Sequence, residues 1–272
     1  MACARECKRS VRILEPVRDV ASAVTVLADR LSQLGWVRDL LVAGSLATGD
    51  YVPGVSDLDL VAVVDGAVDR PRLALLVEVH RELDGGIAAG LELGCVYVND
   101  RSLLDRPARH PTWTHGELVR RILSGVARAE LVRYGFAVTG RPPQEVLPPV
   151  TDTDVRSAAR AEICGYWAWA THRPWMWLNP VIADLGLTSM ARGRHAMRTG
   201  ALLTKTRAVE SADAPHWLIE QLRARRRGEE IASPRLLTGW IAWRDARRTV
   251  RAAHRGQFPP GWGFDQCLNE RR

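Results

Sequence analysis

The chain has 272 residues, of which 46% are hydrophobic and 25% charged, and its formal net charge at pH 7 is +7. This length suits one large domain or two ordinary domains, each with its own core. No apolar run approaches the roughly 20 residues of a transmembrane helix, and the N-terminal residues lack the apolar core of a signal peptide. We therefore expect a cytoplasmic protein that has no membrane partner.

Hydrophobic periodicity predicts a compact α/β unit in the first half of the chain. Apolar residues recur at three- and four-residue intervals over residues 17–34, which indicates an amphipathic helix. Strands are expected at 39–43 and 57–64. A helix over 69–84 should follow, because it begins with a proline in its first turn and ends at a glycine pair. A third strand is expected at 91–98.

The pattern changes at a proline-rich stretch over residues 140–149, which predicts a linker or domain boundary. From about residue 152 the hydrophobic spacing is helical almost throughout, and tryptophans are frequent. We expect two domains: an α+β domain over 1–145, with a small mixed sheet and helices, and an all-α helical bundle over 150–272. A packed bundle core accounts for most of the tryptophans.

The five cysteines are an odd number, are scattered and lack histidine partners at zinc spacing, which favours reduced thiols. They are Cys3, Cys7, Cys95, Cys164 and Cys267.

The most informative stretch combines a Gly-Ser pair, Gly44 and Ser45, with the sequence Asp57-Leu58-Asp59. Side chains alternate along a strand, so the two carboxylates should lie on one face, where they repel each other unless a cation binds. The Gly-Ser turn after an apolar strand offers N–H groups and a hydroxyl to phosphate oxygens. A phosphate cradle facing a carboxylate pair is what metal-assisted nucleotidyl transfer needs. An exposed Asp-x-Asp without a metal role is the alternative interpretation.

This combination of Gly-Ser, a spacer and Asp-x-Asp resembles the nucleotidyltransferase superfamily that includes DNA polymerase beta. The resemblance implies that Asp57 and Asp59 hold Mg²⁺ and that Gly44 and Ser45 grip the phosphates of a nucleoside triphosphate. We expect Ser56, next to the first aspartate, to contribute to the same phosphate site.

The resemblance also implies a third carboxylate on a neighbouring strand, and Glu92 is the candidate. It lies between two leucines at the predicted start of the third strand, where an apolar residue would be ordinary. Transfer needs a group that takes the proton from the attacking hydroxyl. We expect Glu92 to do this, to contact the acceptor and to complete the metal site. A structural ion pair is the alternative role.

In the second half, Arg192, Thr199-Gly200 and Lys205 resemble the helical C-terminal domain of bacterial aminoglycoside adenylyltransferases of the streptomycin/spectinomycin type. The resemblance covers roughly residues 40–210. It implies ATP as co-substrate, with Arg192 and Lys205 reaching its phosphates in a cleft between the domains. Lys205 is the only lysine after Lys8, which singles it out further.

The same resemblance implies an aminoglycoside as the acceptor and antibiotic resistance as the biological role. Polycationic acceptors need carboxylates and flat aromatic surfaces, and Trp175 and Asp184 are the candidates for these contacts. Pro180 and Ile182 stand where further acids are expected, and the spacing to Arg192 is shortened. Another antibiotic, a biosynthetic intermediate or a protein side chain therefore remains open as the acceptor.

Charge is unevenly distributed along the chain. Residues 1–140 carry 17 basic and 18 acidic residues, whereas residues 141–272 carry 21 and 13. A basic half can bind nucleic acid, but 36 of the 38 basic residues are arginine, so a general preference for arginine explains the excess. We expect a monomeric enzyme that transfers AMP from ATP to a small-molecule hydroxyl, and a nucleic-acid-binding module is the less favoured alternative.

Overall fold

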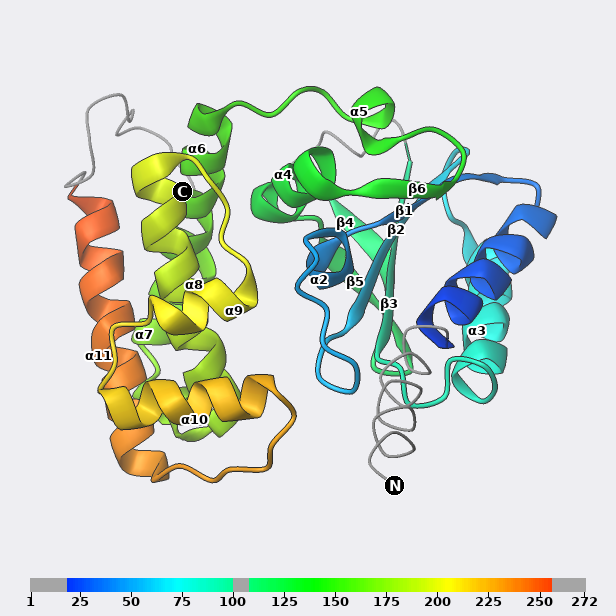
Figure 1. Cartoon of the computed structure of the whole chain (residues 1–272). Coiled ribbons are helices and arrows are strands. Elements are labelled where there is room, and N and C mark those ends of the chain that lie inside the picture. The colour runs from blue at the N-terminus through cyan, green and yellow to red at the C-terminus, as the bar shows by residue number, and fades with distance from the viewer. Residues whose placement is uncertain (1–18, 100–107, 256–272) are drawn as a thin grey trace, which may run out of the picture. The chain divides into compact units, whose positions relative to one another are not determined.

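The structure is a computed structural model that describes residues 19–99 and 108–255 (Figure 1). Its contacts divide the chain into two compact units. The first unit comprises Met1–Leu123 and Glu130–Pro149, and the second comprises Ser124–Ala129 and Val150–Arg272. This division differs from the predicted boundary, because a short segment ahead of the proline-rich stretch packs with the second unit.

The first unit is built on a six-stranded mixed sheet with the order β5-β4-β3-β2-β1-β6. Strands β2 and β3 are parallel, and every other neighbouring pair is antiparallel. The strands are β1 (Val37–Val42), β2 (Leu58–Val64), β3 (Leu93–Asn99), β4 (Arg109–Thr114), β5 (Glu117–Ile122) and β6 (Phe136–Thr139). The mixed sheet confirms the α+β class predicted for this part of the chain.

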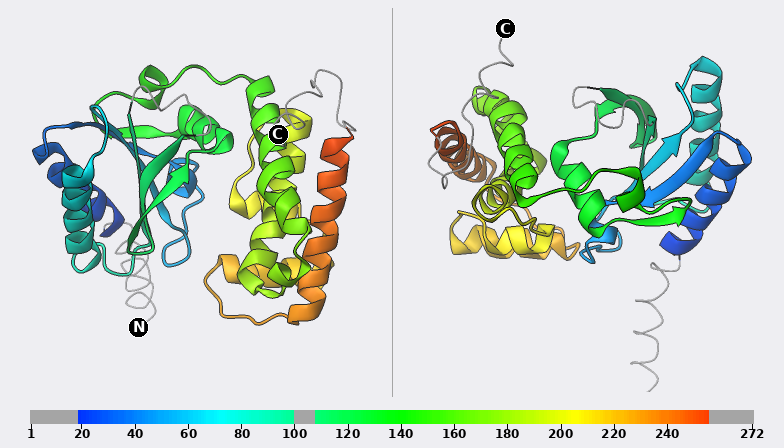
Figure 2. Two further views of the ribbon diagram at one scale, coloured as in Figure 1. Left: turned by 180° about the vertical axis from the view of Figure 1, so that it is seen from behind. Right: turned by 90° about the horizontal axis from the view of Figure 1, so that it is seen from above.

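Two helices cover one face of the sheet, as the views in Figures 1 and 2 agree. One spans residues 19–33 and the other is α3 (Arg70–Asp84). Asp69 caps α3 by accepting a hydrogen bond from the Arg72 backbone N–H at 3.1 Å. The two helices predicted from the sequence are therefore confirmed in the residues that the structure describes. Their apolar faces pack on alternate residues of β2 and β3, which form a single core with them.

Asp57 directly precedes strand β2 and Asp59 is its second residue, and the strand is buried on both faces farther along. Leu58 and Leu60 point into the core beneath the helices, and Val61–Val64 are all buried. An apolar run with no exposed face is typical of a central strand. The prediction that a doubly buried strand follows the two aspartates is therefore confirmed.

The hydrophobic pattern predicts no element in the segment that forms β4 and β5. Pro111 lies within β4, and a proline lacks the N–H that a strand would donate. In β5, the last three residues are exposed, so little apolar alternation marks it. The two strands pair through a two-residue turn at His115 and Gly116.

The second unit is entirely helical in the residues that the structure describes, which confirms the predicted bundle. The Thr151 side chain caps α6 in a capping box with Asp154. Trp167 and Trp177 are buried in its core, whereas Trp175 is 65% exposed. The elements are the start of α4 (Gly125–Tyr134), then α6 (Asp152–Glu162), η1 (Ile163–Trp167), α7 (Ala168–Thr171), η2 (Pro174–Leu178), α8 (Pro180–Thr199), α9 (Lys205–Glu210), α10 (His216–Arg226) and α11 (Arg235–His254).

Close packing of α4 on α6 explains why residues 124–129 belong with the helices. A Cβ on Gly125 would lie 2.8 Å from the Cβ of Ala158. The glycine therefore allows the backbones of the two helices to approach each other directly. Such an approach is visible only in the folded chain, so the linear pattern places the boundary later.

The described cysteines have no disulfide partner. Cys95 is buried in the sheet core and Cys164 is half-buried in the helical unit. Burial raises the pKa of the Cys95 thiol to about 12, so this residue packs as an inert thiol. Cys3, Cys7 and Cys267 lie outside the described residues. No described helix combines the length and the apolar character that crossing a bilayer requires.

A buried ion pair ties the chain segment after β6 back to β1. The Asp39 side chain is 2% exposed and accepts hydrogen bonds from the backbone N and the Nη2 of Arg141, both at 2.7 Å. Burial alone would raise the pKa of Asp39, but the hydrogen bonds and charge of Arg141 outweigh it, so the pKa lies below its ordinary value of 3.8. Gly140, at φ +78°, brings its backbone against this carboxylate.

We predict that Arg141→Gln destabilises the first unit by about 2 kcal/mol, because it leaves a buried carboxylate with fewer donors while the arginine is itself partly exposed. Thermal unfolding followed by circular dichroism measures the loss. Because the pKa of Asp39 is lowered by folding, the difference from the wild type should persist above about pH 4 and shrink as the pH falls further.

The matched control is Arg120→Gln, which removes an exposed arginine with only a 3.4 Å bond to a backbone carbonyl. Equal unfolding temperatures for the two variants would contradict the role given to Arg141.

Candidate active site

The beginnings of β2 and β3 bring the predicted acids to one face of the sheet. The parallel pair has Leu58 opposite Leu93 and Asp59 opposite Gly94, and the backbone N–H of Leu58 donates to the Glu92 carbonyl at 2.9 Å. The two leucines point into the helix-covered core. Asp59 and Gly94 therefore point to the opposite face of the sheet. Asp57 and Glu92 directly precede the two strands, and continued alternation would direct them to the same face.

Gly44 allows the Asp59 carboxylate to lie directly against the turn that follows β1. A Cβ on Gly44 would be only 2.1 Å from Asp59 Oδ2, so no other residue type fits without moving the acid. Gly44 also has a φ of +60°, a conformation that other residues rarely adopt. The Ala43 backbone N–H donates to the Asp59 carbonyl at 2.9 Å. The predicted Gly-Ser pair and the second aspartate are therefore neighbours in the fold.

The two predicted serines differ in their surroundings. Ser45 is the second residue of the short helix α2 (Gly44–Ala47) and is 5% exposed, and its hydroxyl oxygen has no hydrogen-bond partner within the described structure. A buried polar atom of this kind is costly unless a ligand completes it. The Ser56 hydroxyl, by contrast, accepts a hydrogen bond from the Val52 backbone N–H at 3.0 Å, so it also shapes the loop ahead of Asp57.

A tyrosine from the same loop lies within the field of the first aspartate. Burial raises the pKa of the Tyr51 phenol above its ordinary value, and the negative charge of Asp57 raises it further. Asp57 itself is exposed. Its carboxylate is therefore available to solvent and ligands at the edge of the site.

Glu92 differs from its predicted setting, because β3 begins at Leu93, two residues after the predicted start, so that Glu92 lies just ahead of the strand. The glutamate side chain is 61% exposed, so it does not replace a core residue. Its Oε2 lies 3.1 Å from Nδ1 of His115, at the tip of the β4–β5 turn. Asp84 is a second neighbour: burial raises the pKa of Asp84, and the charge of Glu92 raises it further, while the Trp113 indole N–H donates to it at 3.0 Å.

Mg²⁺ was expected between Asp57, Asp59 and Glu92. Across residues 19–99 and 108–255, no three His, Cys, Asp or Glu side chains converge closely enough to hold a metal ion. The donor chemistry nevertheless fits a hard cation, because two carboxylates share one face beside the incompletely bonded Ser45 hydroxyl. The two aspartates are the residues that would hold it.

In the second unit, Arg192 and the segment before Lys205 lie side by side. Nε of Arg192, on α8, donates to the Leu203 carbonyl at 2.9 Å. Gly200, at φ +77°, ends α8 and turns the chain back toward α9, which begins at Lys205. The Thr-Gly turn predicted between the two cations therefore exists, and it brings their segments together.

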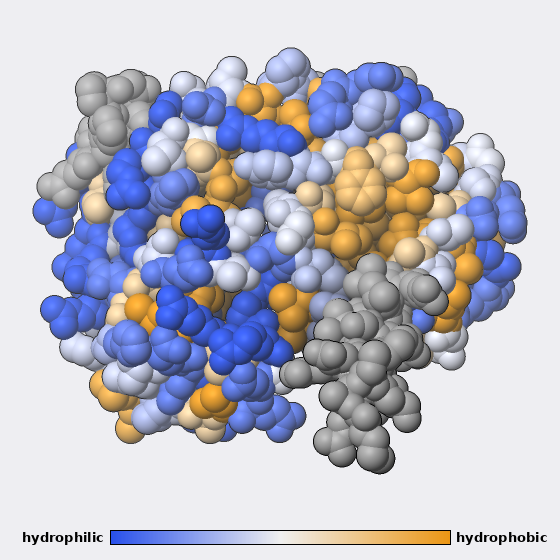
Figure 3. Space-filling view, in the orientation of Figure 1, coloured by the Kyte–Doolittle hydropathy of each residue, from blue (hydrophilic) through white to orange (hydrophobic). Residues whose placement is uncertain are grey.

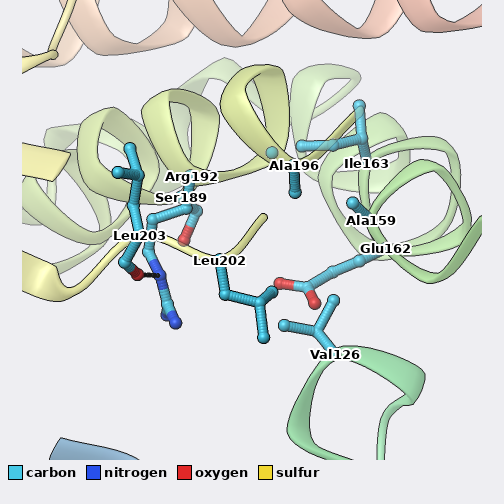
Figure 4. Close-up of a pocket in the computed structure, with 10 residues that line it drawn as sticks. Val126, Ala159, Glu162, Ile163, Ser189, Arg192, Ala196, Leu202 and Leu203 are labelled. Atoms are coloured by element: carbon cyan, nitrogen blue, oxygen red, sulfur yellow. Dashed lines mark hydrogen bonds between the residues drawn. The ribbon is translucent and has the colours of Figure 1, made fainter. Parts of the chain in front are cut away.

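A pocket opens beside Arg192 on the same helices (Figure 4). Its walls are mainly apolar and come from α4, α6, α8 and the segment that leads to α9. The Glu162 carboxylate points into it between Leu202 and Val126, and Ser189 contributes a hydroxyl. The pocket adjoins a π-helical turn at Ile163–Trp167, a feature that often accompanies functional sites. An apolar pocket with a few polar groups suits a small organic ligand.

The two residues predicted to contact the acceptor lie in different settings. Trp175 is exposed on η2 and available for contact. Asp184 is occupied: Nε and Nη2 of Arg225 donate to its two oxygens at 2.6 and 3.0 Å. Burial raises the pKa of Asp184, and the hydrogen bonds and charge of Arg225 offset part of this effect. Arg225 also donates to Ile231 and Ser233, so the pair holds α8 to the chain after α10.

Most of the arginines that make the second half basic are engaged inside the helical unit. Arg223, Arg227 and Arg248 pair with Glu220, Glu229 and Asp213, and Arg244 and Arg247 lie over the rings of Trp240 and Trp243. On the face drawn in Figure 3, this unit is mainly hydrophilic, with separated hydrophobic residues. Arginines paired in this way on solvated helices are an ordinary arrangement.

Comparison with known proteins identifies the class of the first unit. Residues 24–101 match the family model of the nucleotidyltransferase domain. This stretch contains the Gly-Ser pair, both aspartates and Glu92. The chain therefore carries a nucleotidyltransferase domain, and the resemblance and enzyme class inferred from the sequence are confirmed.

The fold of the whole chain resembles that of a solved structure, spectinomycin adenyltransferase AAD(9) from Enterococcus faecialis with ATP and spectinomycin. The TM-score is 0.63 and the identity is 17%, over 87% of this chain and 98% of the other. The likeness extends beyond the nucleotidyltransferase domain and establishes a shared fold. A search of curated protein sequences found no match.

We predict that Gly44→Ala weakens binding of Mg·ATP by about 10-fold or more. Losses of this size are typical when a group that supports a metal ligand is disturbed. The new methyl group would lie only 2.1 Å from Asp59 Oδ2, so the carboxylate would have to move. Isothermal titration calorimetry measures the change. Gly49→Ala is the matched control, because Gly49 also has a positive φ (+69°) but has no atom within 4 Å of its added Cβ. Both variants carry the strain of a positive φ, so equally weak binding in both would contradict a specific clash.

We predict that Asp184→Asn lowers the stability of the helical unit by about 1–2 kcal/mol, because Arg225 loses its charged partner in a partly buried setting. Thermal unfolding measures the loss. The control is Asp213→Asn, whose carboxylate pairs with Arg248 at an exposed site and should have little effect. An Asp184→Asn protein that is as stable as the wild type but binds the acceptor less tightly would restore the predicted acceptor role.

Proposed function

We propose that the protein transfers AMP from ATP to a hydroxyl group of a small molecule and releases pyrophosphate. The observation that carries the proposal is the fit of Asp59 against Gly44, beside Asp57, within a nucleotidyltransferase domain. A similar fold is known in an adenyltransferase solved with ATP, which supports ATP as the nucleotide.

In the proposed reaction, Asp57 and Asp59 would hold Mg²⁺, with Glu92 as the third acid of the site. When bound, the metal neutralises charge on the α-phosphate and on the leaving pyrophosphate. The remaining contacts come from the chain itself. Ser45 offers its hydroxyl and Ser56 supports the loop, and both were expected to grip phosphate. The buried and unbonded Ser45 hydroxyl supports that role.

Arg192 and Lys205 supply positive charge to the triphosphate in this proposal. Their segments lie together through the bond from Arg192 to the Leu203 carbonyl. Arginine presents a planar fork that suits phosphate oxygens, and lysine acts as a point charge. A pair of cations on one helical unit would stabilise the negative charge that builds on the leaving pyrophosphate as its bond to the α-phosphorus breaks.

Glu92 takes the proton of the acceptor hydroxyl. The acceptor oxygen then forms a bond to the α-phosphorus, and the bond from phosphorus to the bridging oxygen of pyrophosphate breaks. The proton ends on the Glu92 carboxylate, and the electron pair of the broken bond leaves with pyrophosphate. The exposure of Glu92 on the Asp57 and Asp59 face supports access to an incoming substrate.

We propose an aminoglycoside-like acceptor, for which the structural neighbour solved with spectinomycin is the support. Trp175 offers an exposed aromatic surface, whereas Asp184 is paired with Arg225. The Glu162 carboxylate in the pocket beside Arg192 is a further anionic group that such an acceptor could use. A different antibiotic, a biosynthetic intermediate or a protein side chain is the alternative acceptor.

The test incubates the purified protein with ATP, Mg²⁺ and a panel that includes streptomycin and spectinomycin, and detects added AMP by mass spectrometry. We expect Asp57→Asn to fold normally and to abolish transfer. Glu92→Gln should still bind ATP while transfer falls by roughly 10²-fold or more, the scale of general-base removal. Loss of ATP binding in Glu92→Gln would instead indicate a purely metal-binding role.

Asp65→Asn is the control, because Asp65 follows the far end of β2 and pairs with Arg38 at an exposed site. It should transfer AMP at the wild-type rate. Wild-type transfer by Asp57→Asn would overturn the assignment of the aspartate pair. Transfer to an acceptor other than an aminoglycoside would retain the chemistry and replace the substrate.

A further inference from the structure

The partner of Glu92 is a histidine from a hairpin that no sequence pattern connects to the site. Nδ1 of His115 lies 3.1 Å from Glu92 Oε2. Glu92 precedes β3 and His115 follows β4, so the antiparallel pairing of these strands, with Cys95 opposite Trp113, brings the two residues together. An ionised carboxylate can only accept a hydrogen bond, so His115 donates through Nδ1–H.

The backbone at His115 is unusual. In residues 19–99 and 108–255, His115 is the only residue other than glycine with a positive φ, which is +49°. Gly116 follows at +72°, and the two form the loop between paired residues Thr114 and Glu117. Two-residue hairpin loops with positive φ at both positions favour Asn-Gly. A histidine here is tolerated, although the turn alone would be better served by asparagine.

We propose that His115 is a positioning residue that holds the Glu92 carboxylate for its role as base. The inference rests on the proposed function. By binding Oε2, the histidine orients the carboxyl group and leaves Oε1 to face the acceptor hydroxyl. Asp84 is a negative neighbour of Glu92, so without the donor the flexible glutamate would turn away from that charge. Both side chains of the pair are more than 60% exposed in the free protein, and a bound acceptor would shield the contact from water.

Two substitutions separate this role from the turn. His115→Gly preserves a backbone that accepts positive φ and removes the donor. His115→Asn also suits the turn, and its Nδ2 is attached to Cγ, as Nδ1 is in histidine, so an N–H donor stays near the same position. His216→Ala is the control, because it removes another exposed histidine, 3.6 Å from Glu220, in the helical unit.

The experiment measures kcat and KM for AMP transfer, with unfolding temperatures, in the wild type and the three variants. We expect His115→Gly to lower kcat by about 10-fold with little change in the KM for ATP. A loss of this size is typical when a residue that orients a site residue is removed. His115→Asn should recover most of that kcat, and His216→Ala should match the wild type. In a Glu92→Gln background, His115→Gly should cause no further loss, because the residue acts through Glu92.

Unchanged kcat in His115→Gly would overturn the inference, and so would a loss in His115→Asn as large as that in His115→Gly. A further 10-fold loss in the Glu92→Gln background would also overturn it, since the histidine would then act independently. Full transfer by Glu92→Gln alone, or no AMP transfer by the wild type, would instead refute the proposed function on which the inference rests.

Discussion

The site depends on one steric fact: the Asp59 carboxylate occupies the space where a side chain at position 44 would begin. Because Gly44 has no Cβ, the turn after β1 and the acid on β2 can be in contact. Two features that lie fifteen positions apart in the chain thereby become parts of one surface. The positive φ of Gly44 is part of the same requirement, since it directs the chain from β1 into α2 at this point.

The parallel pairing of β2 and β3 extends that surface to Glu92. In a parallel pair, residues opposite each other point to the same face. The register places Asp59 opposite Gly94, whereas Leu58 and Leu93 enter the core. Continued alternation would direct Asp57 and Glu92, which directly precede these leucines, to the face of Asp59. A shift of one residue in either strand would send its acids into that core, where unpaired charges are costly. Burial of the leucines thus determines the strand register and, through it, the direction in which the neighbouring acids point.

The sequence was sufficient for the elements that carry strong periodicity: the helix over 19–33, β2, α3 and the helical second unit follow from local patterns. It was insufficient where the outcome depends on contacts between distant segments. The β4–β5 hairpin contains a proline and an exposed second strand, so neither strand has the alternation of a typical one. His115 could be connected to Glu92 only through the pairing of β3 with β4, although the dipeptide His115-Gly116 is a turn signal that could have located the hairpin. The partner of Asp184 is equally non-local, because Arg225 lies 41 residues away.

The pair of Asp184 with Arg225 changes how acceptor recognition should be understood. An aspartate whose two oxygens already bind a guanidinium offers little to a cationic ligand, because the ligand would have to displace a bidentate partner that is anchored to Ile231 and Ser233. Glu162, by contrast, is the acid whose carboxylate points into the pocket beside Arg192 (Figure 4). In the proposed enzyme, acceptor choice would then depend on a pocket that is mainly apolar with one acid, rather than on a row of carboxylates. Such a pocket discriminates by shape and by two opposite charges, since Arg192 lines it together with Glu162.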